Sequence, residues 1–139
     1  MINIIIYEEP KSKGRPVFST KGGKLRAYTS KKTSSYENTI KKKAKEVIPV
    51  PMECAVGIHI KFYLHRPKRL YWKDKEMPAI HCTKRPDLDN LSKAIVDGLN
   101  GVAFKDDRQI VNMHSEKYYH SGNNKSRIEI SIWKEEDLK

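Results

Sequence analysis

Five aspartates lie in one short segment of an otherwise strongly basic chain, residues 84–107 (KRPDLDNLSKAIVDGLNGVAFKDD). Carboxylates that gather in a folded protein repel one another unless a cation lies among them. Oxygen ligands without a set of cysteines or histidines favour Mg²⁺ or Mn²⁺. A divalent ion held by carboxylates, with a lysine nearby, activates water and neutralises the charge that develops during phosphodiester hydrolysis. The five aspartates are Asp87, Asp89, Asp97, Asp106 and Asp107.

The first two aspartates follow a proline. Two residues in a continuous helix lie roughly 200° apart around its axis, so Asp87 and Asp89 could not serve one site there. Pro86 favours the first turn of a helix, and we therefore expect both carboxylates where a loop becomes a helix, pointing past the helix start. Lys93 lies one turn after Asp89 on the same helix face, with Asn90 beside them.

The second acidic pair, Asp106 and Asp107, follows the same helix. A helix of about twelve residues is roughly 18 Å long, whereas five extended residues span about 17 Å. The pair reaches the helix start only if residues 101–107 run antiparallel to the helix. On that expectation, four carboxylates converge on one divalent ion.

A structural alternative stays open for each acid taken alone. Asp87 would then be a helix cap and Asp89 a first-turn partner of the helix dipole. Asp106 and Asp107 would form a turn. We interpret Asp97, in the middle of the helix, as a surface residue.

The elements that would position these residues follow from residue periodicity. Alternating and helical patterns predict the order β-α-β-α-β-β, an α/β (α+β) fold with a mixed four-stranded sheet and two helices in one domain, residues 1–139. Residues 11–32 carry three glycines, one proline and many cations, and residues 66–83 carry two prolines and many cations, so we expect irregular loops in both segments. His59 and His65, on one strand, are interpreted as ordinary surface or packing histidines. The predicted strands are 2–7, 53–67, 108–119 and 126–133, and the predicted helices are 33–49 and the one that begins at the acidic segment.

The charge indicates a polyanionic partner. The formal net charge is +11, and residues 1–50 hold twelve Lys and Arg against four Asp and Glu. A basic surface of this size favours nucleic acid, although a solvated face kept for solubility is the alternative. The flexible basic loop 11–32 would contact phosphates, or else be a mobile surface loop with no partner. The candidate DNA-binding residues are Lys11, Lys13, Arg15, Arg26, Lys31, Lys32 and Arg85.

Two further features bear on location. Cys54 and Cys82 form no CxxC motif, and we expect free thiols in a reducing compartment. The apolar run near the N-terminus is far too short for a signal peptide or a membrane span. We therefore expect a cytoplasmic protein without a membrane partner.

The acidic segment also resembles a known family. RPDLDNLSKAIVDGLNGVAFKDDRQI (85–110) is similar to the signature of the RusA-type Holliday junction resolvases, a D-L-D-N-L-x-K helix start followed by D-D-x-Q-[IV]. The stretches KGRPVF and AYTSKKTSSYE resemble the N-terminal part of that family. The resemblance implies a homodimeric, Mg²⁺-dependent endodeoxyribonuclease of DNA recombination and repair, which resolves four-way DNA junctions by paired symmetric nicks.

Residue by residue, the resemblance implies that Asp87, Asp89 and Asp107 are the catalytic metal ligands. It makes Asp106 an accessory carboxylate and Lys93 the active-site lysine. Some family members have a basic residue where this chain has Pro86, so that Arg85 is displaced by one position. A homodimer is also physically reasonable, because a two-fold pair of sites matches a substrate with its own two-fold axis.

Two other functions remain open at this point. Pro86-Asp87 followed by Asp106-Asp107-Arg108 faintly resembles the PD-(D/E)xK nucleases, with an arginine in place of the usual lysine. That motif is loose and often matches by chance. The other alternative is a basic nucleic-acid-binding protein without catalytic activity, whose acidic residues are structural.

Overall fold

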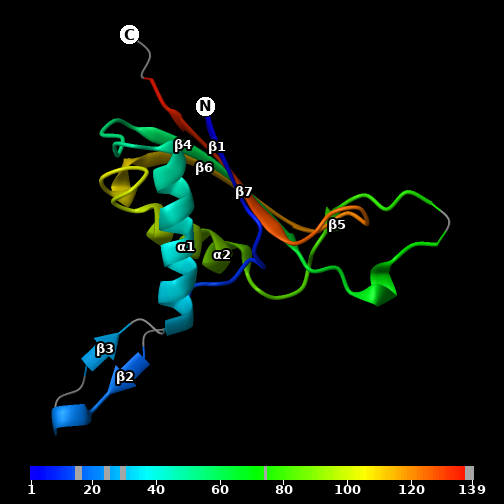
Figure 1. Ribbon diagram of the computed structural model, residues 1–139, viewed down its shortest axis with the longest axis horizontal. Coiled ribbons are helices and arrows are strands. Elements are labelled where there is room, and N and C mark those ends of the chain that lie inside the picture. Colours follow the sequence, from blue (N-terminus) through cyan, green and yellow to red (C-terminus); the bar gives the residue numbers. More distant parts are fainter. Residues whose placement is uncertain (15–16, 24–25, 29–30, 74, 137–139) are drawn as a thin grey trace.

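Two α-helices pack against one face of a five-stranded sheet (Figure 1). The strand order is β1-β7-β4-β6-β5, and a separate hairpin pairs β2 with β3. The sheet is mixed, because β4 and β6 are parallel while the other neighbours are antiparallel. The computed structural model describes residues 1–14, 17–23, 26–28, 31–73 and 75–136. The elements are β1 (Ile2–Ile6), β2 (Val17–Ser19), η1 (Lys21–Gly23), β3 (Arg26–Tyr28), α1 (Lys31–Val47), β4 (Val56–Leu64), η2 (Lys68–Leu70), β5 (Ile80–His81), α2 (Leu88–Leu99), η3 (Asp107–Gln109), β6 (Ile110–Tyr119) and β7 (Arg127–Lys134).

The predicted strands and helices are all present, but the predicted four-stranded sheet and the predicted order β-α-β-α-β-β were wrong. β5 adds a fifth strand to the sheet, inside the segment 66–83 that we expected to be irregular. β2 and β3 form a hairpin inside the predicted loop 11–32, and α1 begins at Lys31, two residues earlier than predicted. Strands of two or three residues are too short to show an alternating pattern, which explains why the sequence did not reveal them.

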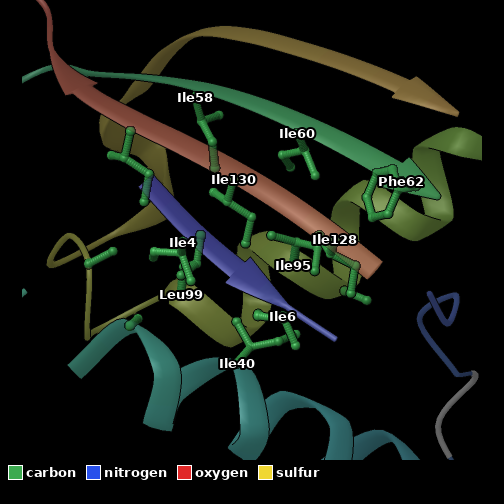
Figure 2. Close-up of a cluster of buried hydrophobic side chains, with 14 of the residues drawn as sticks. Ile4, Ile6, Ile40, Ile58, Ile60, Phe62, Ile95, Leu99, Ile128 and Ile130 are labelled. Atoms are coloured by element: carbon green, nitrogen blue, oxygen red, sulfur yellow. The ribbon is translucent and has the colours of Figure 1, made fainter. Parts of the chain in front are cut away.

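Branched aliphatic side chains at alternate positions of β1, β4 and β7 form the core beneath the helices (Figure 2). Each such side chain contributes on the order of 1.5–3 kcal/mol when it is fully buried. The helices approach each other closely at Gly98 of α2. A Cβ added there would lie only 2.9 Å from Cβ of Ile40 in α1, so a larger residue would not fit without a shift. This contact fixes where α2 lies on the sheet. The side chains labelled in Figure 2 are Ile4, Ile6, Ile40, Ile58, Ile60, Phe62, Ile95, Leu99, Ile128 and Ile130.

The opposite face of the sheet carries polar and aromatic side chains. A row of planar groups crosses it from strand to strand. The rings of His81 and Tyr118 stack with centroids 5.0 Å apart, and those of Tyr118 and Tyr63 with centroids 5.4 Å apart. The guanidinium of Arg127 lies 3.7 Å from the centroid of the Tyr63 ring. α1 and α2, the two α-helices of the described residues, both lie on the other side.

None of the helices in the described ranges is long and apolar enough to cross a membrane. Both cysteines are free, as predicted, with Cys82 buried and Cys54 partly buried.

Candidate functional site

The first acidic pair lies where we predicted it, at the start of α2. Asp87 is the N-cap residue, with φ −69° and ψ 141°, and its side chain makes no capping hydrogen bond. Asp89 lies in the first turn, and both residues are exposed. Neither forms an ion pair with any described residue. The side chain of Asp87 therefore does not cap the helix, contrary to the structural alternative for that residue, whereas Asp89 lies in the first turn, where the helix dipole favours an acid.

The two carboxylates border different open clefts, which share no lining residue. Asp87 lines one cleft with Ser12, Arg85, Pro86 and Asn90. Asp89 lines the other cleft, which has an apolar floor between α2 and β6 and also contains Lys93. Asp89 and Lys93 thus line the same cleft, as their spacing predicts. Both aspartates belong to the N-terminal end of α2, which favours negative charge.

The second acidic pair forms a rigid turn. The side chain of Asp106 accepts a hydrogen bond of 3.0 Å from the backbone N–H of Arg108, and the side chain of Gln109 accepts one of 2.8 Å from the backbone N–H of Asp106. Gln109 also donates to the carbonyl oxygens of Met52 and Cys54. The hydrogen bond from Arg108 lowers the pKa of Asp106 below its ordinary value. Asp106 is therefore engaged in capping η3.

Asp107 is exposed beside this cap, in the first turn of η3. Its carboxyl group lies within hydrogen-bonding distance of that of Asp106. Because Asp106 caps the turn, Asp107 is the member of the pair that is placed to act as a ligand.

The two pairs lie at opposite ends of α2, and the predicted return of residues 101–107 along the helix was wrong. These residues turn tightly at the C-terminal end of α2, with the N–H of Gly101 bonded to the carbonyl of Phe104 and the N–H of Ala103 to that of Leu99. Lys105 is then held by the carbonyl of Met52. In Figure 1 this segment (yellow) lies at the end of the sheet away from β5.

The element that runs back along α2 is β6. Its Ser115 hydroxyl accepts a hydrogen bond of 2.9 Å from Ser92, and Lys117 Nζ donates to the carbonyl oxygen of Pro86 at 2.7 Å. Asp107 precedes β6 and Pro86 precedes α2, so the pairs are separated by the length of the helix, about 18 Å. One chain therefore does not bring Asp107 to Asp87 and Asp89.

The candidate DNA-binding residues divide into three groups. Lys13 bonds to Glu37, and its Nζ lies 3.1 Å from Asp97, so two carboxylates neutralise it. Asp97 is thus partly buried in an ion pair and is not the plain surface residue that we predicted. Arg15 lies outside the described residues, and Arg26 is described only through the backbone of β3. The exposed members of the set are Lys11, Lys31, Lys32 and Arg85.

A second group of potential ligands lies on the open face of the sheet and was missed from sequence. His59 of β4 pairs directly with His114 of β6, and Glu116 is two residues further along β6. One ligand atom from each lies within 4.8 Å of the others. The available signal was the His-x-Glu spacing, which places two ligands on one face of a strand, but pairing with His59 depends on the parallel register of β4 and β6.

Comparison with known proteins gives two kinds of match. Residues 8–133 match the family model described as endodeoxyribonuclease RusA. The chain is 34% identical over 116 residues to the crossover junction endodeoxyribonuclease rusA of Lactococcus phage r1t, covering 79% of each chain. It is 28% identical over 137 residues to the uncharacterized protein YqaN of Bacillus subtilis (strain 168), covering 94% of each chain. The chain therefore belongs to the RusA endodeoxyribonuclease family.

Proposed function

We propose that the protein is a Mg²⁺-dependent endodeoxyribonuclease that resolves four-way DNA junctions as a homodimer, by paired symmetric nicks, in DNA recombination and repair. Family membership and the name of the phage relative support the reaction. The observation that supports the proposal in this chain is the pair of aspartates at the start of α2, which are exposed and form no ion pair with any described residue.

The residues at the start of α2 fit half of a site for a hard divalent cation. Asp87 and Asp89 offer carboxylate oxygens, which Mg²⁺ prefers, and Mn²⁺ accepts the same ligands. A bound ion would lower the pKa of water and neutralise charge on the phosphate that is cleaved. Lys93 lines the same cleft as Asp89 and would stabilise the phosphorane or orient the attacking water. Asn90 borders the cleft of Asp87 as an accessory polar group.

The missing ligand, Asp107, is best supplied by a second subunit. Among the described residues, β5 pairs with β6 at Tyr118 and Tyr119, the N–H of Cys82 bonds to the carbonyl oxygen of Lys117, and no strand pairs with the outer edge of residues 110–116. Val111 and Met113 on this stretch are 65% and 43% exposed. A long unpaired edge with exposed apolar side chains favours association with another strand.

A two-fold pairing of β6 with its own copy would complete the site. In an antiparallel pair centred between residues 111 and 112, residue 107 of one chain lies opposite residues 115–117 of the other, before the part of the edge that pairs with β5. Lys117 in that range is bonded to Pro86, next to Asp87. The pairing therefore carries Asp107 of the partner subunit to the start of α2, and the two-fold axis generates two equivalent sites.

The basic residues would bring DNA to these sites. Lys11 and Lys32 border a cleft that also contains Pro86, immediately before Asp87. Arg85 borders the cleft of Asp87 itself. These cations are exposed, and they would attract phosphates to the edge of the acidic centre.

Mixing two inactive variants tests the proposal. Asp89→Asn and Asp107→Asn should each bind junction DNA but cut it at least about 100-fold more slowly than the wild type, since each loses a ligand. In an equimolar mixture, heterodimers regenerate one intact shared site each. About a quarter of the wild-type number of sites should return, producing nicked junctions.

Three outcomes would contradict the proposal in different ways. Wild-type cleavage by Asp89→Asn would remove the metal assignment. No recovery in the mixture, despite subunit exchange, would place all ligands in one chain and contradict the shared site. Equal cutting of linear duplex and junction would favour a PD-(D/E)xK-type nuclease, and binding without Mg²⁺-dependent cutting would favour a non-catalytic binding protein.

A further inference from the structure

The geometry on the open face of the sheet points to a second metal site. We propose that His59, His114 and Glu116 bind one borderline divalent transition-metal ion per chain, of the Zn²⁺ class, separately from the carboxylate centre. The three residues belong to β4 and β6 and project from the face of the sheet opposite the helices.

The ligand atoms already converge. His59 Nε2 lies 3.0 Å from one oxygen of Glu116, and His114 Nε2 lies 3.4 Å from the other. Ligands of a tetrahedral zinc ion, with bonds of about 2.0–2.2 Å, are separated from each other by roughly 3.3 Å. The two imidazole rings meet edge to face with centroids 4.7 Å apart. Small rotations of the side chains would therefore bring all three atoms to bonding distance.

The scaffold beneath the cluster is rigid. β4 and β6 pair from Val56 to Leu64, and the side chains on the reverse face of β4 are buried in the core. His59 and His114 lie directly opposite each other in this ladder. Ligands supplied by paired strands need little ordering before they bind, and the entropic cost of binding is correspondingly low.

The chemistry of the ligands selects the ion. Two imidazoles and one carboxylate suit Zn²⁺, Co²⁺ or Ni²⁺, whereas Mg²⁺ prefers oxygen ligands and retains its waters. The side chains of His59, His114 and Glu116 are 33%, 63% and 30% exposed, so an ion can enter from solvent. Three protein ligands leave a coordination position open, as in zinc sites that also bind water or an added ligand.

The site is independent of the carboxylate centre within a chain. Glu116 and Lys117 are neighbours in β6 but project to opposite faces of the sheet, and Lys117 contacts Pro86 on the helix side. Removing Asp89 should therefore leave the histidine site intact, and removing His59 should leave Asp87 and Asp89 in place.

Titration of a metal-free chain without an affinity tag tests the proposal. We expect one Zn²⁺ per chain by calorimetry in excess Mg²⁺, an intense visible absorption with Co²⁺, and a Zn²⁺-dependent rise in the melting temperature. His59→Ala and His114→Ala should weaken Zn²⁺ binding at least about tenfold each. His65→Ala, which removes a histidine just beyond the end of β4, is the matched control and should bind as the wild type does.

Three other results would each overturn the proposal. Zn²⁺ binding that survives in the His59→Ala/His114→Ala double variant would place the ion elsewhere. Binding that is lost in Asp89→Asn or displaced by Mg²⁺ would assign it to the carboxylate centre. Absence of a stoichiometric Zn²⁺ site in the wild type would mean that the three residues form only a hydrogen-bonded cluster. The melting temperature of each variant without metal checks that the chain remains folded.

Discussion

The acidic centre and the His–Glu cluster differ in how the fold provides their ligands. His59, His114 and Glu116 come together within one chain, because a parallel strand pair sets their register. Asp87 and Asp107 are held at opposite ends of a helix and cannot meet in one chain. The cluster is preformed on a rigid sheet, whereas the proposed acidic centre would require a second subunit.

If the proposed function is correct, this difference has a consequence for cleavage. A nuclease site that exists only in the dimer cannot cut one strand as an isolated subunit, so cleavage is linked to the symmetric arrangement that a junction matches. A site complete within each chain has no such dependence. Assembly should therefore control the acidic centre and leave the cluster unaffected.

The largest effect should come from substituting Asp107. Its neighbour Asp106 is expected to have a different role, so the same substitution there serves as the comparison. Asp107→Asn should reduce junction cleavage at least about 100-fold, because a ligand is lost. Asp106→Asn should stay within about fivefold of the wild type, since asparagine also caps a helix. Single-turnover cleavage with Mg²⁺ measures both. A larger loss for Asp106→Asn than for Asp107→Asn would reverse the two roles.

The sequence predicted the first acidic pair well and the second poorly. Pro86 and the helical repeat after it locate Asp87 and Asp89 at a helix start, which is a local property. The position of Asp107 depends on the tight turn around Phe104 and on the bonds of Gln109 to a distant segment. No local pattern encodes those contacts. The estimate from the length of an extended chain therefore gave the wrong path for residues 101–107 relative to α2.

The next largest effect should come from disrupting the proposed dimer. Val111→Lys combined with Met113→Lys should charge the free edge of β6 and shift the dimer to monomer, with at least about a tenfold loss of cleavage at dilute protein. Sedimentation and cleavage rates measured across a range of protein concentrations would show it. Val50→Lys, at an apolar residue that is 71% exposed elsewhere, is the control and should change neither. A stable dimer in the double variant would move the interface away from β6.

The strands of the fold follow the same rule as the acidic residues: those encoded by a local pattern were predicted, and those that depend on tertiary contacts were not. In β4 and β7, large apolar residues recur at every second position over eight or more residues, and this pattern can be recognised from sequence alone. The parallel pairing of β4 with β6 and the two-residue β5 depend on tertiary contacts. A short strand gains its hydrogen bonds from its neighbour and needs no pattern of its own.

A smaller effect should distinguish the roles of Lys11 and Lys13 in stability and in DNA binding. Burial alone would lower the pKa of Lys13, but its hydrogen bonds to Glu37 and Asp97 outweigh burial and raise it. Lys13→Met should therefore cost about 1–2 kcal/mol of unfolding free energy, because it leaves two partly buried carboxylates unpaired. Lys11→Met should cost less than about 0.5 kcal/mol but reduce the salt dependence of DNA binding by about one unit of slope. Denaturant unfolding and binding titrations at several salt concentrations distinguish them, and the opposite pattern would make Lys13 the phosphate contact.

The smallest effect should be a pH dependence at the His–Glu cluster in the absence of metal. The hydrogen bond from His59 holds the pKa of Glu116 below its ordinary value of 4.5, with smaller contributions from His114 and Tyr118. A carboxyl whose pKa is lowered by folding stabilises the folded state above the unfolded pKa, and that stability is lost as pH falls through the folded pKa.

Glu116→Gln should therefore be less stable than the wild type at pH 6–7 by at most about 0.5 kcal/mol, since the side chain is partly exposed and screened by solvent. The difference should disappear as pH falls below about 4.5. Denaturant unfolding from pH 7 to pH 3 in a chelating buffer measures it, with Glu46→Gln, at an exposed residue of α1, correcting for the change in net charge. If the difference between wild type and Glu116→Gln instead grew with acidity, Glu116 would be stabilised in its protonated form, and the two histidines would not act on it as hydrogen-bond donors.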